Sequence, residues 1–428
     1  MTQLGETAHA PSETHHAHGD DDHAVVLLDH LIDHGPTTRT GLATATGLGR
    51  AAVAGLSARL AEAGVLRIES ADAAGDGRPG RIALTAADHV LVVALLGIDD
   101  AVATISTLAG HELARFTEPL AAPPADGADA DRGGRSAAAS ALDSLAVVID
   151  RALAQADRVG RPVADVTVIV DGAVAGAPEL AVADERLGLE PLDVVGALGS
   201  RSPRLTEAAL PSPITLQPAS VVAALAEAAA MPGIDDLLVV SGDTQVAAAV
   251  IARGAPLRGA HGLAGLLGHL PIVPNGVRCT CGQRGCLVTV AGPDVVLARA
   301  GLVAFAAANG RSAALGELVV RVEESDDRAR WSWLDAALWI GRTLQVVVPA
   351  IDPAVVVVRG YWGSLAGDIE TAFRDNRPSF GGGAFAAIPT VTAGRTGPDG
   401  PIAGARRQAR ARLVATPSLL ALVDEEHR

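Results

Sequence analysis

The sequence contains no lysine, and only 2% of its residues are aromatic. Its 34 strongly basic residues are therefore all arginine, set against 49 acidic residues, for a net charge of -15. A chain this acidic is a poor candidate for coating nucleic acid nonspecifically, although a local DNA-reading patch stays possible. Because alanine, valine, glycine and leucine are so abundant, the bias indicates genome-wide composition, and no function is attached to it.

The sequence also gives no indication of disulfides or of membrane-spanning segments. The three cysteines lie within residues 279–286, too few and too close for a disulfide framework. No uncharged apolar run reaches about 18 residues, and the N-terminus lacks a basic region followed by an apolar one. We therefore expect a cytoplasmic protein without a membrane partner. Its 428 residues suffice for two or three domains.

The most informative segment is GHLPIVPNGVRCTCGQRGC, which contains every cysteine of the chain. It offers four potential metal ligands: His269, Cys279, Cys281 and Cys286. Zinc binds thiolate and imidazole tetrahedrally, and four protein ligands leave no open position for water or substrate. The alternative is three buried thiols beside a loop histidine, but glycines and prolines make this segment a poor place to bury thiols. The spacing therefore predicts a structural zinc site.

The N-terminal region changes character near Ala24. Residues 1–23 end in HHAHGDDDH and have no apolar period, so they are predicted to be a disordered His/Asp-rich tail. From Ala24 to Gly35 the spacing of Val25, Leu28 and Ile32 predicts a helix that Gly35 and Pro36 end.

A second short helix capped by Thr38 follows, then a tight turn at Gly47 and a third helix over residues 50–63 with Val53, Leu56 and Leu60 inward. The segments VLRIES and RIALTA predict a β-hairpin. Three helices and a hairpin over residues 24–88 make a winged helix-turn-helix, whose third helix would enter the DNA major groove.

The charge of this unit is the weak point of a DNA-binding interpretation. Residues 24–88 hold six arginines and seven acidic residues, a net charge of -1. DNA binding would then need arginines gathered on one face and two copies of the unit. A small helical domain that docks a protein partner remains the alternative.

Residues 89–428 alternate strands and helices. Strand candidates occur at HVLVVALLG, ATISTLAG, ELARFTEPL, VTVIVDG, DLLVVSG and AVVVVRG. Helices are expected at about 138–156, from Pro218, and through about Leu344, and residues 122–136 are expected to be a surface loop. This order predicts an α/β core with a mixed sheet.

With the winged motif, GRPGRIALT and GAHGLAGLLGH followed by CTCGQRGC all in order, the chain resembles the ROK family of repressors and sugar kinases. IDPAVVVVRG is similar to a strand and turn near the end of the family domain. The resemblance implies an actin-like pair of α/β lobes over residues 89–428, preceded in regulators by the winged helix. In the family a histidine ten residues before a C-x-C-x4-C set binds zinc, which matches His269 to Cys279.

The sugar-kinase residues implied by the resemblance are replaced. The family's Asn-Asp pair, whose aspartate accepts the sugar hydroxyl proton, falls on Pro218 and Ala219. Two sugar-binding carboxylates fall on Leu266 and Val288, and the aspartate of the first phosphate loop falls on Leu95. Residues 245–249 replace the second glycine-rich turn, and their Cβ atoms obstruct a close approach of phosphate. His261 reads as a structural loop residue.

These observations predict a DNA-binding transcriptional regulator, most simply a repressor, without kinase activity. Its expected partners are a double-stranded DNA operator, an unidentified small-molecule effector and further copies of itself as a homodimer or homotetramer. The predicted DNA contacts are Arg39, Arg50, Arg59, Arg78 and Arg81. A protein-interaction scaffold built on the degenerate kinase fold remains the alternative function.

Overall fold

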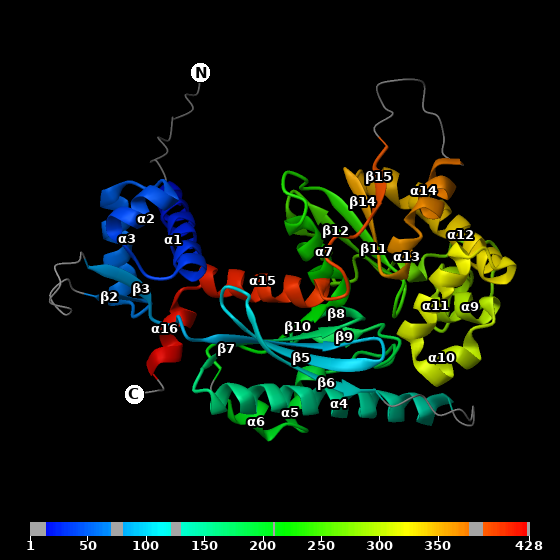
Figure 1. Cartoon of the computed structure of the whole chain (residues 1–428), viewed down its shortest axis with the longest axis horizontal. Helices are drawn as coiled ribbons and strands as arrows, with labels where there is room; N and C mark the ends of the chain where they lie inside the picture. Colours follow the sequence, from blue (N-terminus) through cyan, green and yellow to red (C-terminus); the bar gives the residue numbers. More distant parts are fainter. Residues whose placement is uncertain (1–13, 70–79, 121–129, 209, 376–387, 426–428) are drawn as a thin grey trace, which may run out of the picture.

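The computed structural model describes residues 14–69, 80–120, 130–208, 210–375 and 388–425. A small N-terminal unit lies at one end of the molecule and is followed by two α/β lobes (Figure 1). Each lobe contains a five-stranded sheet. The α/β fold class predicted from the sequence is confirmed.

The N-terminal unit is a winged helix-turn-helix. Its elements are α1 (Thr14–His34), β1 (Thr37–Thr38), α2 (Arg39–Thr46), α3 (Arg50–Glu62), β2 (Leu66–Glu69) and β3 (Arg81–Leu84). The Thr38 hydroxyl accepts a hydrogen bond from the Gly41 amide at 3.0 Å and so caps α2. Gly47 ends α2 with φ +72°, a conformation that glycine adopts without steric cost. Val53, Leu56 and Leu60 are buried on α3, as their spacing predicts.

Three details of this unit differ from the expectation. Helix α1 begins at Thr14, so residues 14–23 are helical rather than disordered, while residues 1–13 lie outside the described chain. Leu27, Leu28 and Leu31 are the buried side chains of α1, because this helix packs against α15 as well as its neighbours. Strand β1 was not expected; its two residues pair with β3.

The first lobe is built on a mixed sheet of order β10-β7-β4-β5-β6. Its strands are β4 (Val90–Leu96), β5 (Asp100–Thr107), β6 (Glu112–Pro119), β7 (Val163–Val170) and β10 (Thr215–Pro218). β4, β5 and β6 form an antiparallel meander, while β7 and β10 run parallel to β4. Helix α4 (Ala130–Arg158) packs on this sheet and begins earlier than predicted, so residues 130–136 are helical and not part of a loop. α5 (Val194–Gly199), α6 (Pro203–Glu207) and the hairpin β8 (Ala173–Ala175) and β9 (Leu180–Val182) complete the lobe.

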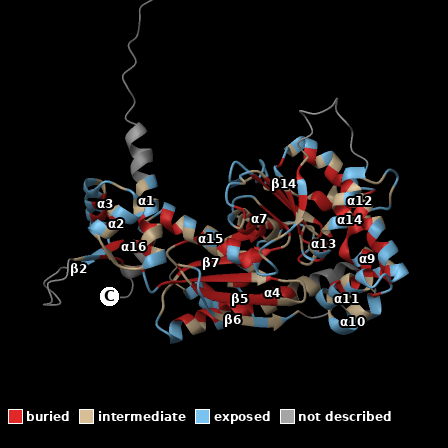
Figure 2. Ribbon diagram, turned by 45° about the horizontal axis from the view of Figure 1, so that its top comes forward, coloured by how far each residue is buried: buried red, intermediate tan, exposed pale blue. Residues whose placement is uncertain are grey.

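The second lobe has a sheet of order β13-β12-β11-β14-β15. Its strands are β11 (Leu237–Ser241), β12 (Ala247–Ala252), β13 (Ala255–Pro256), β14 (Val355–Arg359) and β15 (Thr390–Ala393). Helix α7 (Ala219–Ala229) packs against β11 and β12. The remaining helices are α8 (Val288–Ala291), α9 (Pro293–Ala300), α10 (Val303–Asn309), α11 (Arg311–Glu323), α12 (Asp327–Ile351), α13 (Tyr361–Ser364) and α14 (Ala366–Asp375). Trp333 and Trp362 are fully buried in the core of this lobe. Figure 2 shows buried residues in β14 and on α12 of the same lobe.

The C-terminal helices join the winged helix to the lobes. α15 (Gly400–Ala415) packs along α7 and the first sheet, and its far end reaches α1 (Figure 1). α16 (Ser418–Glu425) follows it. One hydrophobic cluster contains Leu28 of α1, Leu91 of β4 and Leu413 of α15. The winged helix therefore shares a hydrophobic core with the first lobe and is packed against it.

Candidate functional site

The four predicted metal ligands lie together at one point of the second lobe. His269 ends a 3-10 turn, Cys279 and Cys281 lie on the following loop, and Cys286 precedes α8. One ligand atom from each residue lies within 4.8 Å of all the others. The Cys279 sulfur is 3.6 Å from His269 Nδ1, and the Cys281 and Cys286 sulfurs are 3.6 Å apart. Sulfurs that share a tetrahedral zinc ion are about 3.8 Å apart, so this donor set fits zinc.

Backbone contacts hold the cysteine loop in shape. The Cys279 amide donates to the Gln283 carbonyl at 2.8 Å, and the Val273 amide donates to the Gly285 carbonyl at 2.9 Å. Gly285 has φ +73°, and a Cβ atom there would lie 2.0 Å from the Val273 carbonyl oxygen. Only glycine permits this close approach of two chain segments. The turn residues of the sequence therefore bring the three thiols into one shell.

Burial and the closeness of the thiols shift the pKa values of the cluster residues. Burial lowers the pKa of His269, which keeps the imidazole neutral and able to bind a metal. Burial, followed by the neighbouring Cys281 and Cys279 thiols, raises the pKa of Cys286 to about 12. A divalent cation would remove this penalty by stabilising the thiolates.

The metal cluster adjoins a small cavity between the lobes. Leu266, three residues before His269, lines this cavity together with Pro218 and Asp171. Arg258 of the second lobe also lines the cavity, and its guanidinium donates to Gln217 Oε1 of the first lobe at 2.8 Å. The remaining volume is about 20 Å³, which is room for a single water molecule. The structure thus brings together Leu266, aligned with a sugar-binding carboxylate, and Pro218, aligned with the asparagine of the catalytic pair, at a cavity too small for a hexose.

The other replaced residues are dispersed. Val288 packs against the hydrophobic core of the second lobe. Ala219 and Leu95 line a larger cleft between the lobes, whose volume of about 690 Å³ is of the size of a small-molecule site. Ala247, which falls within the family's glycine turn, begins strand β12. His261 is an exposed loop residue.

A carboxylate occupies the turn at the carboxyl end of β14. Asp243 follows the parallel neighbour β11, and its Oδ1 accepts the Tyr361 amide at 2.9 Å. Gly360 has φ +65°, and a Cβ atom there would lie 1.8 Å from Asp243 Oδ2. The ring of Trp362 covers Gly242 in the same way. The turns after β11 and β14 therefore pack against each other without a gap. The Tyr361 amide, which could otherwise bind an external anion, already donates to Asp243.

Hydrogen bonds join the two lobes across the cleft. Gln245 Nε2 donates to the Asp171 carbonyl at 2.5 Å. Asp99 of the first lobe accepts the Arg311 and Ser312 amides of α11 at 2.9 and 2.8 Å. This carboxylate at a helix N-terminus also interacts favourably with the helix dipole. The chain thus supplies its own contacts across the cleft.

Asp171 is a site residue that the sequence reading missed. It follows β7 directly and lines both cavities. Burial, with Asp184 next, raises the pKa of Asp171 to about 7. The signal was its place after a buried strand, because ligands of α/β sheets gather at the carboxyl ends of strands.

The predicted DNA-binding arginines lie on the winged helix with one exception. Arg39 and Arg50 begin α2 and α3, and both are exposed. Arg59 is exposed on the last turn of α3, and Arg81 donates to the Pro36 carbonyl. Arg78 lies outside the described residues. Between the two arginines of α3 the exposed face carries only small residues: Ala51, Ala54, Gly55 and Ala58.

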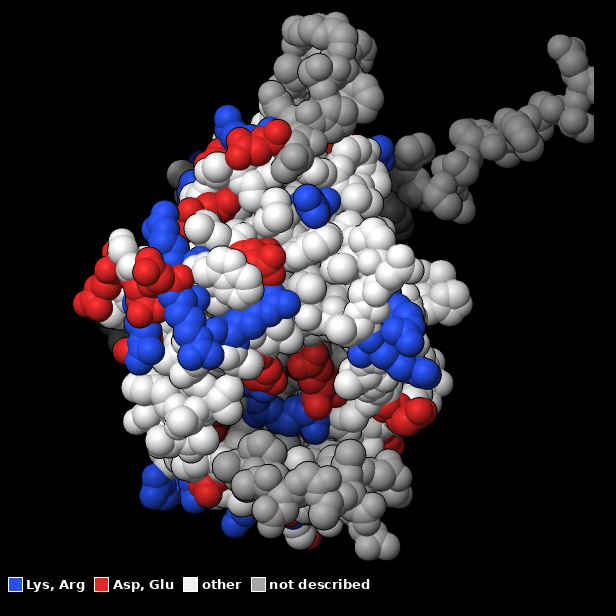
Figure 3. Space-filling view, turned by 90° about the vertical axis from the view of Figure 1, so that its right-hand side faces the viewer, with Lys and Arg blue, Asp and Glu red and all other residues white. Residues whose placement is uncertain are grey.

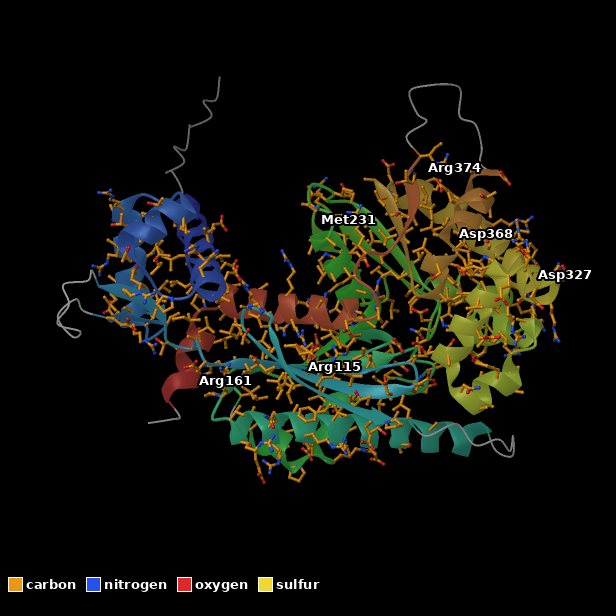
Figure 4. All side chains as sticks on the ribbon, in the orientation of Figure 1. Arg115, Arg161, Met231, Asp327, Asp368 and Arg374 are labelled. Carbon is orange, nitrogen blue, oxygen red and sulfur yellow. The ribbon has the colours of Figure 1, made fainter. Side chains whose placement is uncertain are left out.

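Helix α15 connects the cleft to this winged helix. Pro401 in its first turn lines the larger cleft. Near its other end Arg410 donates to Asp29 Oδ1 at 2.8 Å and to Asp33 Oδ2 at 2.9 Å, both on α1. Arg115, labelled in Figure 4, bonds Asp399 at 2.9 Å just before α15 begins. Sequence patterns gave no indication of this link, since each of these contacts joins segments far apart in the chain.

Solved structures resemble this fold at low identity. One is a ROK family transcriptional regulator described as a homolog of the E. coli MLC protein, with a TM-score of 0.68, 19% identity, and coverage of 94% of this chain and 99% of that one. Another is a ROK family glucokinase from Streptomyces griseus in complex with glucose and AMPPNP, with a TM-score of 0.56, 21% identity and coverage of 75% and 99%.

Curated sequence relatives are named as kinases. The N-acetylmannosamine kinase of Escherichia coli strain SE11 is 28% identical over 227 residues, which span 53% of this chain and 71% of the relative. The kanosamine kinase of Amycolatopsis mediterranei is 31% identical over 164 residues, spanning 38% and 52%. Residues 134–405 match the model of the ROK family. That match covers more than half of the chain, which therefore belongs to the ROK family.

Proposed function

We propose that this protein is a DNA-binding transcriptional regulator, acting as a repressor, and not a sugar kinase. One observation carries the proposal: an exposed arginine-bearing helix of a winged helix-turn-helix is joined to lobes whose sugar cavity has room for one water. The likeness to the ROK regulator covers 94% of the chain, against 75% for the glucokinase, which supports a regulator's domain composition. Reduced thiolates suit action in the cytoplasm.

The proposed DNA contacts follow from the geometry of α3. Arg50 stands at the start of this helix, where base edges or phosphates are reached first. Arg39 and Arg59 flank it, and Arg78 and Arg81 belong to the wing that would approach the minor groove or the backbone. Because small residues separate the arginines of α3, few side chains are left to read bases. Sequence specificity is then modest, or is carried by the arginines, with two copies of the unit on one operator.

The lack of kinase activity is proposed from the filled site. Pro218 and Ala219 cannot accept the proton of a sugar hydroxyl, and Leu266 cannot pair with one. Asp243 places a negative charge on the turn amide of Tyr361, where an incoming phosphate would be repelled. Any single replacement could be compensated, but the base, the sugar pocket and the phosphate turns are altered together.

The larger cleft is the proposed effector site. It has the volume of a ligand site, and Asp171, Glu227, Asp243 and Arg359 are the charged residues that line it. Glu227 and Arg359 form an ion pair, so Asp171 and Asp243 are the remaining acidic groups of the lining and disfavour a nucleotide. We therefore propose a neutral or cationic small molecule. Helix α15, about 24 Å long, would transmit a change in the cleft to α1.

Zinc is the proposed metal of the Cys3His cluster. His269, Cys279, Cys281 and Cys286 would hold it, and a shell of four protein ligands has a structural role. The ion would fix the loop that leads from Leu266 to α8. It would therefore support one wall of the closed sugar cavity.

The experiment that tests the proposal is sequencing of genomic DNA fragments selected by the purified protein, with and without candidate small molecules. We expect enrichment of an inverted repeat, and loss of that enrichment in Arg50→Ala. Arg151→Ala is the matched control, because Arg151 is a half-exposed arginine on α4, remote from the winged helix. Unchanged selection by Arg50→Ala removes the assigned contact. No enrichment by any form favours the alternative, a scaffold that binds protein partners.

A further inference from the structure

Two histidines lie one helical turn apart on the exposed side of α1. The rings of His30 and His34 are stacked, with centroids 4.3 Å apart and an angle of 18° between their planes. Residues four positions apart lie above one another on the same face of a helix. The buried face of α1 is formed by Leu27, Leu28 and Leu31, and the pair lies outside it, with His34 exposed and His30 half-buried. Two imidazoles are therefore presented together at the surface of the winged helix.

The hydrogen bond of His34 determines which of its ring nitrogens is free. His34 Nδ1 lies 3.1 Å from the His30 carbonyl oxygen. Because a carbonyl oxygen only accepts hydrogen bonds, Nδ1 carries the proton, and the lone pair of the neutral ring is on Nε2. Histidines that bind metal commonly donate their second ring nitrogen to a backbone carbonyl in this way. The helix thus orients one imidazole of the pair as a metal ligand.

The charge at this end of α1 favours a cation. Asp29 and Asp33 share a single guanidinium, that of Arg410, so one negative charge remains. The carbonyl groups of the last helical turn add the negative end of the helix dipole. The end of the molecule opposite the winged helix differs, because arginine and acidic side chains are mixed there on a largely uncharged face (Figure 3). A dication bound by the two imidazoles would therefore lie beside a local surplus of negative charge.

We propose that His30 and His34 form a second metal site, which binds a divalent transition metal ion through both imidazoles. Two histidines four residues apart on a helix are a recurrent zinc-binding pair, and imidazole also suits Ni²⁺ and Cu²⁺, whereas Mg²⁺ and Ca²⁺ prefer oxygen ligands. Metal–nitrogen bonds of about 2.0–2.1 Å place two ligating nitrogens roughly 3 Å apart, which the stacked rings reach by small side-chain rotations. Water completes the shell, because Asp33 already bonds Arg410.

A metal ion at this site changes the charge of the winged helix. Residues 24–88 hold six arginines and seven acidic residues, so one divalent ion turns their net charge from -1 to +1. A positive unit attracts the phosphates of DNA, and the ion therefore strengthens DNA binding. This consequence rests on the proposed function, whereas metal binding by His30 and His34 does not.

Chemical labelling of histidines, located residue by residue, tests the site in the full-length protein. Diethyl pyrocarbonate modifies free imidazole nitrogens, and peptide fragmentation in a mass spectrometer separates His30 and His34 from the other histidines of the chain. We expect Ni²⁺ to suppress the labelling of both residues, while Mg²⁺ leaves it unchanged. The exposed His111, on the turn between β5 and β6, is the internal control and should be labelled equally under all conditions. Equal labelling of His30 with and without Ni²⁺ overturns the proposal.

The substitution His34→Ala tests whether the two imidazoles act together. Loss of one ligand of a chelating pair should weaken Ni²⁺ binding at least about tenfold, so the protection of His30 disappears at the same Ni²⁺ concentration. His23→Ala is the matched control, because His23 lies on the same helix about 10 Å along the axis from His30 and should leave the protection intact. Protection of His30 that survives His34→Ala, or that is lost equally in His23→Ala, contradicts the proposal. Intact protection without enrichment of any DNA fragment removes the proposed function and leaves the metal site.

Discussion

At the scale of single residues, the cleft between the lobes is marked by carboxylates that follow the strands or bond the starts of helices. Asp243 binds the turn after β14, and Asp99 binds the start of α11. Asp171 lines both cavities, and desolvation there disfavours its charged form. Its protonation therefore affects the stability of the closed cleft.

Asp171 should make folding stability fall as pH rises. Its pKa is raised to about 7 in the folded chain from an ordinary value of 3.8, so between these values the folded state holds a proton that the unfolded state has lost. Stability from this group is present below about pH 4 and is lost as pH rises towards 7. Relative to the unsubstituted protein, Asp171→Asn should gain stability between pH 5 and pH 7. Urea unfolding at pH 5 and pH 7 measures the free energy of unfolding of both proteins. If Asp171→Asn differs from the unsubstituted protein by the same amount at both pH values, the prediction is wrong.

Cys281 should be essential for the metal and for the stability of the second lobe. Cys281→Ser removes one of four donors, so we expect loss of bound zinc and a decrease in stability of several kcal/mol, because structural zinc contributes folding free energy. Metal analysis after extensive dialysis and a thermal unfolding curve measure both. Gln283→Ala, at an exposed residue of the same loop whose backbone carbonyl alone bonds Cys279, should keep zinc and unfolding temperature. A folded, zinc-free native protein would show that the cluster does not serve as a metal site.

At the scale of elements, α15 is the connection on which a regulatory role depends. It contacts the cleft with its first turn and α1 with its last turns. The pKa of Asp33 on α1 is lowered chiefly by its hydrogen bond to Arg410. A helix held at both ends transmits displacement better than a flexible linker, so the winged helix should respond to the lobes.

Arg410→Ala should loosen the winged helix. It removes charge-assisted hydrogen bonds to Asp29 and Asp33, and because both carboxylates are nearly half exposed we expect a loss of roughly 1 to 2 kcal/mol. Amide hydrogen exchange over residues 24–34 should accelerate. Arg407→Ala, an exposed arginine on the same helix, should leave the exchange unchanged. Equal rates in the two variants would mean that apolar packing alone holds α1.

At the scale of the whole molecule, the two lobes enclose a ligand-sized cleft and a much smaller cavity beside Leu266 and Pro218. The cleft measures about 690 Å³ and the small cavity about 20 Å³. Hydrogen bonds made by Asp99, Gln245 and Arg258 join the two lobes.

The purified protein should not phosphorylate sugars. Glucose and N-acetylmannosamine, offered with ATP, should give no product, and calorimetry should detect no binding of either sugar. A ROK glucokinase such as that of Streptomyces griseus is the positive control in the same assay. ATP-dependent phosphorylation that disappears in Asp171→Asn would show that the cleft is an active site.

The sequence by itself determined the local features. The winged helix followed from apolar spacing and from Thr38 and Gly47, because capping and left-handed turns depend on neighbouring residues. The metal cluster followed from ligand type and spacing over 18 residues, since a short loop of glycines and prolines can close only in a few ways. The family resemblance then indicated which kinase residues were replaced.

Only the tertiary structure decided what depends on distant segments. Asp99 meets α11 across 212 positions of sequence, and Arg410 meets α1 across 377 or more. Residue patterns do not encode such pairings, because the partners come together only when the lobes and helices pack. The volume of the sugar cavity has the same origin. Pro218 and Leu266 indicate missing chemistry in the sequence, whereas the fold shows that their side chains also take the space.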